Sequence, residues 1–192
     1  GLIYRVVGGG TDILATRRPG EMVDVLGPLG RTFKPVQAGS PVVMVAGGVG
    51  VAPFLSLAQE TIRSGQAAPD DMTVLFGAAT AGLLSGEEKF RALGISVQTA
   101  TDDGSHGHNG FVTRLLEDII QHEPERSTFI YACGPTPMMR VVQTMANEAG
   151  IPGQVSLEGI MPCGVGVCMA CVVPCVNPDA PEAAARYERV CH

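Results

Sequence analysis

The feature that most constrains the fold is a regular alternation of apolar and amphipathic segments from Pro41 to Ala149. It begins with Val42-Val43-Met44-Val45-Ala46, a continuous apolar run typical of a strand buried on both faces. Segments with helical periodicity and further short apolar runs then follow in turn. Strict alternation of this kind predicts an α/β fold, a doubly wound parallel sheet with right-handed crossovers.

We assign this domain to residues 39–152 and expect its strands and helices to alternate along the chain. The strands are expected at residues 42–46, 72–76, 95–99 and 128–133, and the helices at 52–64, 87–93, 111–121 and 137–149.

Residues 1–38 have a different composition and are expected to form the end of an antiparallel β domain. Leu2–Val7 and Glu21–Leu26 are predicted as short strands, and Ile13–Thr16 as a short helix. Two or three strands cannot form a stable sheet without partners. We therefore expect the chain to be a fragment of a longer protein.

The third region, residues 153–192, is predicted to be a small metal-binding module. Cys163, Cys168 and Cys171 follow the spacing C-x4-C-x2-C, and Cys191 comes later. This is the spacing of plant-type [2Fe–2S] proteins. Glycines between the first two cysteines let the loop turn its N–H groups toward the sulfurs. The spacing predicts a [2Fe–2S] cluster held by these four cysteines.

Other uses of the cysteines fit the sequence less well. Cys175 is an alternative fourth ligand, but its gaps differ from the bacterial four-iron run, and Val176 follows where that run has Pro. Zinc sites usually combine two C-x2-C pairs or spaced histidines. A disulfide framework is typical of small secreted domains. Cysteines kept for a metal instead indicate a reducing cytoplasm.

Composition argues against two classes of partner. The net charge is −6 and no cluster of Lys and Arg occurs, which argues against a nucleic-acid-binding protein. No apolar run approaches the roughly 20 residues that a membrane-spanning helix needs.

A glycine turn follows the first predicted strand and opens the first predicted helix. Its sequence is Gly47-Gly48-Val49-Gly50-Val51-Ala52-Pro53, and Gly47, Gly48, Gly50 and Pro53 are candidate cofactor-binding residues. Such a turn presents the helix N-terminus to a pyrophosphate. The alternative is a tight turn that only packs the helix on the sheet. The acidic residue that usually marks NAD preference is missing after Phe76, so the choice between NAD and NADP stays open.

Cys133-Gly134-Pro135 ends the fourth predicted strand, at the carboxyl edge of the sheet where open α/β sheets bind ligands. Cys133 is a candidate contact for a nicotinamide ring, and the alternative is a buried structural thiol.

A polar loop, Thr101–Gly110, follows the third predicted strand. His106 and His108 could bind a metal, but a solvated loop is the favoured interpretation, and Asp102 and Asp103 are interpreted as turn residues. We find no nucleophile triad, metal-hydrolase helix or P-loop, and we predict no catalytic residue.

These motifs together resemble the ferredoxin-reductase superfamily, and within it the electron-transfer subunits of NAD-dependent type B dihydroorotate dehydrogenases. The resemblance extends over nearly the whole chain. The segments that carry it are Ile3-Tyr4-Arg5, Gly10-Thr11, the Asp24–Gly30 turn, the Gly47–Pro53 loop, Thr101–Gly104, Cys133-Gly134-Pro135, and Ser156-Leu157-Glu158 with the cysteine block.

The resemblance implies an oxidoreductase subunit with FAD, NAD and a [2Fe–2S] cluster as cofactors. Residues 1–38 would form the C-terminal part of its FAD-binding β-barrel. The residues there that would contact FAD are Ile3, Tyr4, Arg5, Gly10 and Thr11. A partner subunit with FMN would oxidise dihydroorotate in pyrimidine biosynthesis, in a heterotetramer. The family's R-P-x-S flavin motif, expected before Gly1, and the D-G-P expected after the last cysteine are not in the sequence.

Two alternative functions stay open. The first is the small flavin and iron–sulfur subunit of an NADH-dependent ferredoxin:NADP or sulfide oxidoreductase, or of a hydrogenase. In those relatives the first cluster ligand is commonly Asp, whereas this chain has Cys163. The second alternative is a non-catalytic, zinc-stabilised nucleotide-binding module.

Overall fold

The computed structural model describes residues 4–122, 124, 129–176 and 185–191. The chain divides into two compact units, and each is described by itself. The first unit consists of residues 1–5 and 33–156, and the second of residues 6–32 and 157–192.

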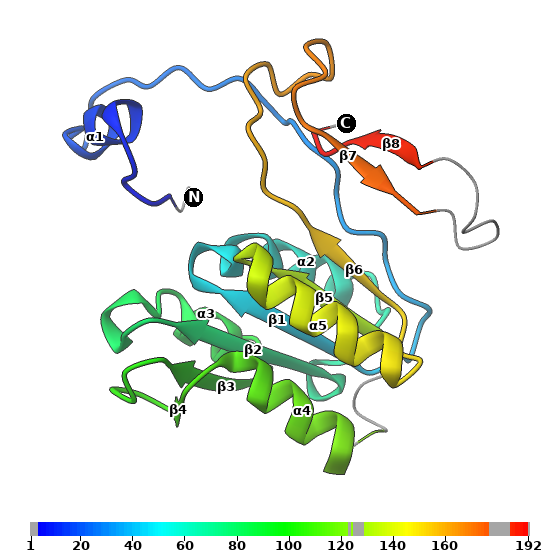
Figure 1. Cartoon of the computed structure of the whole chain (residues 1–192). Helices are drawn as coiled ribbons and strands as arrows, with labels where there is room; N and C mark the ends of the chain where they lie inside the picture. The colour runs from blue at the N-terminus through cyan, green and yellow to red at the C-terminus, as the bar shows by residue number, and fades with distance from the viewer. Residues whose placement is uncertain (1–3, 123, 125–128, 177–184, 192) are drawn as a thin grey trace. The chain divides into compact units, whose positions relative to one another are not determined.

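The first unit is built on one parallel sheet, shown in Figure 1. Its strands are ordered β4-β3-β2-β1-β5-β6, and every neighbouring pair is parallel. The bounds are β1 (Val42–Gly47), β2 (Met72–Ala78), β3 (Ser96–Thr101), β4 (His108–Asn109), β5 (Phe129–Cys133) and β6 (Gly153–Ser156). This arrangement confirms the predicted α/β fold with a parallel sheet.

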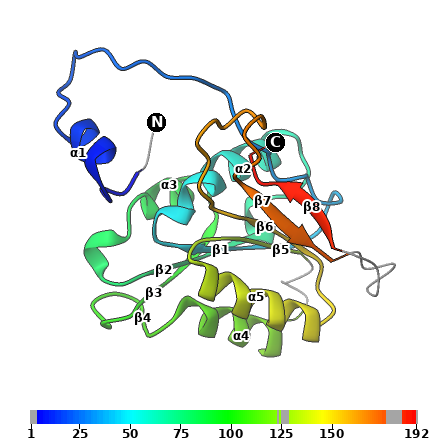
Figure 2. The ribbon, with the colours of Figure 1, turned by 45° about the horizontal axis from the view of Figure 1, so that its top comes forward.

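Helices cover both faces of the sheet, with α4 and α5 on one face and α2 and α3 on the other (Figure 2). Their bounds are α2 (Ala52–Arg63), α3 (Glu87–Ala92), α4 (Val112–His122) and α5 (Thr136–Glu148). Short 3-10 helices form at η1 (Gly48–Val51), η2 (Pro69–Asp71) and η3 (Ala81–Leu83). The predicted helices end within two residues of these bounds, because their apolar stripes mark the buried faces well.

The core lies along the two central strands. Every residue of β1 and β2 is buried, which explains why both segments are continuous apolar runs rather than alternating ones. Phe54 from α2 and Phe90 from α3 pack into the same core cluster as Met44 and Phe76.

Two strands of this sheet were not predicted. β4 contains two residues, and β6 has only one strongly apolar residue, Val155, so neither carries a clear pattern. β6 pairs with β5 and belongs to the sheet, whereas the prediction placed Gly153 at the start of the cysteine module. The sheet unit extends to Ser156.

The N-terminal segment differs from the expected strands. A helix, α1 (Gly9–Ala15), replaces the shorter one expected at 13–16. Glu21–Leu26 forms no strand, and Tyr4–Val7 is irregular, while residues 1–3 lie outside the described part. A strand needs a neighbour for its hydrogen bonds, and none of the described residues pairs with these two segments.

The second unit contains an antiparallel hairpin of β7 (Val172–Cys175) and β8 (Arg186–Arg189). Glu188 on β8 forms a 2.9 Å ion pair with Arg31, which joins the two chain segments of this unit. Within the described residues of both units, no helix is long and apolar enough to cross a membrane.

Tyr131 on β5 anchors the chain as it enters the sheet unit. Its hydroxyl donates a 2.6 Å hydrogen bond to the carbonyl oxygen of Lys34, which also accepts from Gln154 Nε2 at 3.0 Å. Phe33 packs edge-on against the Tyr131 ring and stacks on Phe54. Burial raises the pKa of the Tyr131 hydroxyl from 10.0 to about 12.

We predict that Tyr131→Phe lowers the free energy of unfolding by about 1 kcal/mol near neutral pH, because it removes one buried hydrogen bond. The neutral phenol is favoured in the folded state, so its contribution to stability is complete below pH 10 and is lost as the pH rises toward 12. Urea titrations across this range should therefore show a smaller alkaline loss of stability in the variant. Tyr187→Phe, at a side chain 69% exposed, is the control. Equal alkaline profiles for wild type and Tyr131→Phe would contradict this assignment.

Candidate functional site

The order of the strands creates a crossing point between β1 and β5. The chain builds β2, β3 and β4 on one side of β1 and then returns to place β5 on the other side. Ala46 and Cys133 are partners in register, so the carboxyl ends of the two strands lie together. Open α/β sheets bind ligands in the crevice at such a point. The structure thus brings the predicted glycine turn beside Cys133-Gly134-Pro135.

Two glycines of the turn allow this close approach. A Cβ on Gly47 would lie 2.6 Å from Pro135 Cδ and 2.8 Å from Met138 Sδ. A Cβ on Gly50 would overlap the carbonyl oxygen of Cys133. Gly47 and Gly50 therefore have a packing role, which is the alternative raised for this motif, and their contact with a nucleotide stays a prediction.

Gly48 has a different environment. Its φ of +55° favours glycine, and a built Cβ meets no heavy atom within 4 Å. The turn leads into α2, whose first turn contains Pro53 and whose N-cap, Val51, makes no side-chain capping bond. Of the first residues of α2, Ala52 donates its N–H to the Val49 carbonyl and Pro53 has no N–H. The N–H groups that would face a pyrophosphate are therefore those of the preceding turn, η1. Gly48 is the position of the turn from which a side chain would extend into open space.

Cys133 is buried, with 4% of its surface exposed. A Cβ built on Gly134, the next residue, would lie 2.8 Å from Met138 Cε and 2.9 Å from the Cα of Gly47, so the segment admits little change. Contact between Cys133 and a nicotinamide ring remains a prediction.

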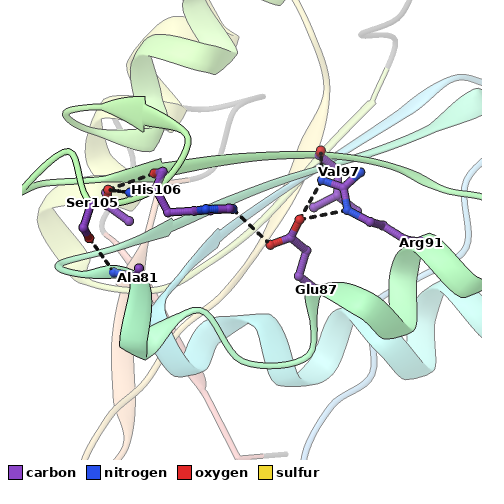
Figure 3. Close-up of polar contacts among 7 residues, drawn as sticks. Ala81, Glu87, Arg91, Val97, Ser105 and His106 are labelled. Atoms are coloured by element: carbon purple, nitrogen blue, oxygen red, sulfur yellow. Dashed lines mark hydrogen bonds and ion pairs between the residues drawn. The ribbon is translucent and has the colours of Figure 1, made fainter.

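Hydrogen bonds hold the loop after β3 against the end of β2 and the segment that follows it. Figure 3 shows one of these bonds, between Ala81 and Ser105. Backbone N–H groups of Asp102 and Asp103 donate to the carbonyls of Ala78 and Ala79 at 3.1 and 3.3 Å. Ala81 N–H donates to Ser105 Oγ at 2.8 Å.

Within this loop, Asp103 acts as the predicted turn residue. Its Oδ1 accepts from the Ser105 hydroxyl at 2.6 Å and from the Ser105 N–H at 3.0 Å. These two bonds, the hydroxyl first, lower the pKa of Asp103 and keep its carboxylate ionised. Because the Asp103 N–H is bonded to the Ala79 carbonyl, this ionised carboxylate lies near the end of β2.

The two loop histidines have separate surroundings. His106 Nε2 lies 3.6 Å from Glu87 Oε2, and Glu87 also pairs with Arg91 at 2.6 Å (Figure 3). His108 lies in β4 and is exposed. Across the described residues, no three His, Cys, Asp or Glu side chains gather where they could hold one metal ion.

The four predicted cluster ligands lie in the second unit as two pairs. Cys171 and Cys191 are buried, and their sulfurs lie 3.2 Å apart. The Cys168 thiol makes a hydrogen bond to Cys163. A [2Fe–2S] cluster has two irons and takes two thiolates at each, whereas zinc draws four ligands to one ion. The pairs therefore fit a two-iron cluster.

Backbone groups in the loop favour the thiolate form of Cys163, which is the form that binds metals. The N–H of Cys168 contributes most, followed by the N–H of Val165, the Cys168 thiol and the N–H of Val167. Together they lower the pKa of Cys163 from 9.0 to about 6. Positive φ values at Gly164 and Gly166 allow the loop to turn these amides inward.

At the second pair, the hydrogen bond from the Cys191 thiol lowers the pKa of Cys171. The same contact, together with burial, raises the pKa of Cys191.

The hairpin explains why Cys191 and Cys175 differ as ligands. Cys171 precedes β7 directly and Val190 N–H donates to its carbonyl at 3.1 Å, so Cys171 and Cys191 lie at one end of the hairpin. Cys175 pairs with Arg186 at the opposite end, about 13 Å along the strand from Cys171. This placement supports Cys191 as the fourth ligand, although Cys175 is also half-buried.

The residues expected to contact FAD are divided between the two units. Ile3 lies outside the described residues, and Tyr4 and Arg5 belong to the first unit. Gly10 and Thr11 belong to α1 in the second unit, where Thr11 Oγ1 accepts from Val7 N–H at 2.9 Å. Their contact with FAD remains a prediction.

Comparison with protein families gives two matches. The oxidoreductase NAD-binding domain matches residues 44–144, which form most of the sheet unit. The iron–sulfur cluster binding domain of dihydroorotate dehydrogenase B matches residues 158–192, which contain all four predicted ligands.

Individual relatives agree with these matches. The chain is 42% identical to the dihydroorotate dehydrogenase B (NAD(+)) electron transfer subunit of Desulforamulus reducens, over 90% of this chain and 63% of the relative. It is 40% identical to the corresponding Bacillus cereus subunit, over 99% of this chain and 69% of the relative. The chain belongs to this family of electron transfer subunits. It spans about two thirds of the length of these curated relatives.

Two solved structures have a similar fold. An NADH-dependent reduced ferredoxin-NADP oxidoreductase, described in connection with flavin-based electron bifurcation, has a TM-score of 0.76 and 31% identity, over 89% of this chain and 59% of that one. The C-terminal domain of a Pyrococcus furiosus hydrogenase has a TM-score of 0.51 at 18% identity, over 68% of this chain and 100% of that one, and shows the fold alone. The comparisons support the predicted cofactors, a [2Fe–2S] cluster, FAD and NAD.

We predict that Cys191→Ser abolishes or strongly perturbs the cluster, because it removes one of two thiolates at one iron. Cys175→Ser, at the far end of the hairpin, should leave about two irons per chain and an unchanged electron paramagnetic resonance (EPR) spectrum. Iron analysis and EPR of anaerobically purified, dithionite-reduced protein test both variants. A lost signal in Cys175→Ser with a retained signal in Cys191→Ser would reverse the choice of ligand.

We predict that Gly48→Asp weakens NADH binding about tenfold, because its carboxylate would face the pyrophosphate. Gly48→Asn is the matched control, since Asn and Asp both tolerate positive φ and differ mainly in charge. Calorimetric titration with NADH measures both affinities. Equal affinities of the two variants would remove the turn from the pyrophosphate site.

Proposed function

We propose that this chain is the electron transfer subunit of an enzyme that oxidises dihydroorotate and reduces NAD+ in pyrimidine biosynthesis. The observation that carries the proposal is the cysteine module. Its four predicted ligands lie in two pairs, and its sequence matches the iron–sulfur domain of dihydroorotate dehydrogenase B. The relatives that bear this name cover the rest of the chain as well.

Each proposed cofactor, the cluster, FAD and the nicotinamide nucleotide, has its own set of proposed binding residues. Cys163, Cys168, Cys171 and Cys191 would hold the cluster, and the turn at Gly47–Gly50 with Pro53 would orient the nucleotide. When bound, FAD links one-electron transfer at the cluster to two-electron transfer at nicotinamide. Tyr4, Arg5, Gly10 and Thr11 are proposed FAD contacts, together with Ile3.

We assign no catalytic residue for dihydroorotate to this chain and place its oxidation on a partner subunit with FMN, in a heterotetramer. Three apolar side chains between the cysteines, Val165, Val167 and Met169, are exposed. Exposed apolar groups beside a redox centre suit a docking surface, because electron transfer needs the two centres to be close. Free cysteines reserved for a metal support a cytoplasmic location.

We propose NAD rather than NADP as the nucleotide. From Gly77, near the end of β2, to Leu84, the chain has no Lys or Arg to bind a 2′-phosphate. The ionised Asp103 is fastened beside this strand end and would repel a phosphate while accepting a hydrogen bond from a 2′-hydroxyl.

An NADH-dependent ferredoxin:NADP oxidoreductase subunit is the second candidate, because that class of enzyme has the similar structure described above. The cysteine at position 163, where such subunits commonly have Asp, favours the dihydroorotate function. A zinc-stabilised module is disfavoured by the two-pair arrangement.

The decisive experiment uses the full-length protein. We predict that it oxidises NADH with an artificial dye alone, because the nucleotide and flavin sites share one subunit. It should turn over dihydroorotate only when the FMN-bearing partner is added. Oxidation of dihydroorotate without the partner, or a preference for ferredoxin and NADP, would overturn the proposal.

Docking of the partner is tested with Val167→Asp, at a side chain 78% exposed. We predict that it spares NADH–dye activity and lowers dihydroorotate–NAD activity about tenfold, because it places a charge in the contact. Val176→Asp, at a valine 74% exposed beyond β7, is the control and should leave both activities near wild type.

A further inference from the structure

The peptide group between Gly166 and Val167 is held from both sides. Its carbonyl oxygen, on Gly166, accepts a 2.8 Å hydrogen bond from Arg189 Nη1. Its N–H, on Val167, donates toward the sulfur of Cys163. Gly166 is buried although Val165 and Val167 are exposed, so this carbonyl needs a partner from the protein. One peptide thus connects a guanidinium to a cluster ligand.

Arg189 is well placed to hold this peptide. It ends β8 and pairs in register with Val172, the residue after Cys171. The next residue, Val190, donates its N–H to the Cys171 carbonyl at 3.1 Å. The Gly166 N–H also points to Cys191. The strand that carries Arg189 is therefore held to Cys171 by its backbone, while its side chain contacts the loop at Gly166.

The physical consequence concerns the charge on the sulfurs. A charged donor on a carbonyl makes a stronger hydrogen bond than a neutral one. Hydrogen bonds in a chain polarise one another, so a cation at the carbonyl strengthens the N–H at the other end of the peptide. Hydrogen bonds to cluster sulfurs favour the reduced, more negative state and raise its reduction potential.

We infer that Arg189 is a positioning residue that raises the reduction potential of the [2Fe–2S] cluster through the Gly166–Val167 peptide. The inference rests on the cluster assignment within the proposed function and adds a role for a residue outside the ligand set. It also predicts the direction of the change in reduction potential: loss of Arg189 lowers the potential, so the cluster becomes harder to reduce.

A matched control variant separates the effect of the Arg189–Gly166 hydrogen bond from the effect of losing one positive charge. Arg186 lies on the same strand, and its guanidinium pairs with Glu188 at 3.3 Å. Arg186→Gln removes the same charge from the hairpin without removing the bond to Gly166. Arg189→Gln removes both the charge and the bond.

The test is an EPR-monitored redox titration of the full-length protein in complex with its partner, with iron analysis of every variant. We expect Arg189→Gln to lower the equilibrium constant for cluster reduction about tenfold, which is about 59 mV for a one-electron couple. Arg186→Gln should change it less than about threefold. Equal shifts in the two variants overturn the inference.

Arg189→Lys provides a second measurement if Arg189→Gln fails to retain two irons. Lysine keeps the charge but lacks the planar fork and the reach of arginine. We expect a potential below that of wild type, and a wild-type potential in Arg189→Lys overturns the inference. Absence of a [2Fe–2S] signal in the wild-type complex would instead overturn the proposed function itself.

Discussion

The close contact between the turn after β1 and the segment after β5 is the constraint on which the sheet unit depends. Gly47 and Gly50 have no side chains, so the backbone of Cys133-Gly134-Pro135 can lie directly against them. Any larger residue would separate the ends of β1 and β5, which meet where the order of strand addition reverses. The same contact that closes the fold also shapes the crevice at the start of α2.

The second unit is held together differently, because its four predicted ligand cysteines lie near one another with few buried apolar side chains around them. Glycines at 164 and 166 turn the loop, and the hairpin fixes Cys191 beside Cys171. Backbone amides supply most of the compensation for negative charge at Cys163. A module of this size thus depends on the bound group and on backbone polarity more than on apolar burial.

Sequence patterns predicted the parallel sheet and its helices well, because buried strands and amphipathic helices have strong periodicity. They did not reveal β4 or β6, which are short edge strands, and they wrongly placed a strand at Glu21–Leu26. Local propensity cannot show whether a strand will find a neighbour. The cysteine spacing identified the candidate ligands, whereas Arg189 could not have been found, because nothing in a sequence indicates which arginine will meet a particular carbonyl.

The position of Cys191 after the hairpin has a consequence for the order of assembly. Cys163, Cys168 and Cys171 lie within nine residues of the chain, whereas Cys191 reaches Cys171 only when β7 and β8 have paired. The ligand set would therefore be complete only in a chain whose hairpin has formed. Cluster insertion would in this way report on folding of the last strand, because metal binding and folding are coupled where the ligands come together only in the folded chain.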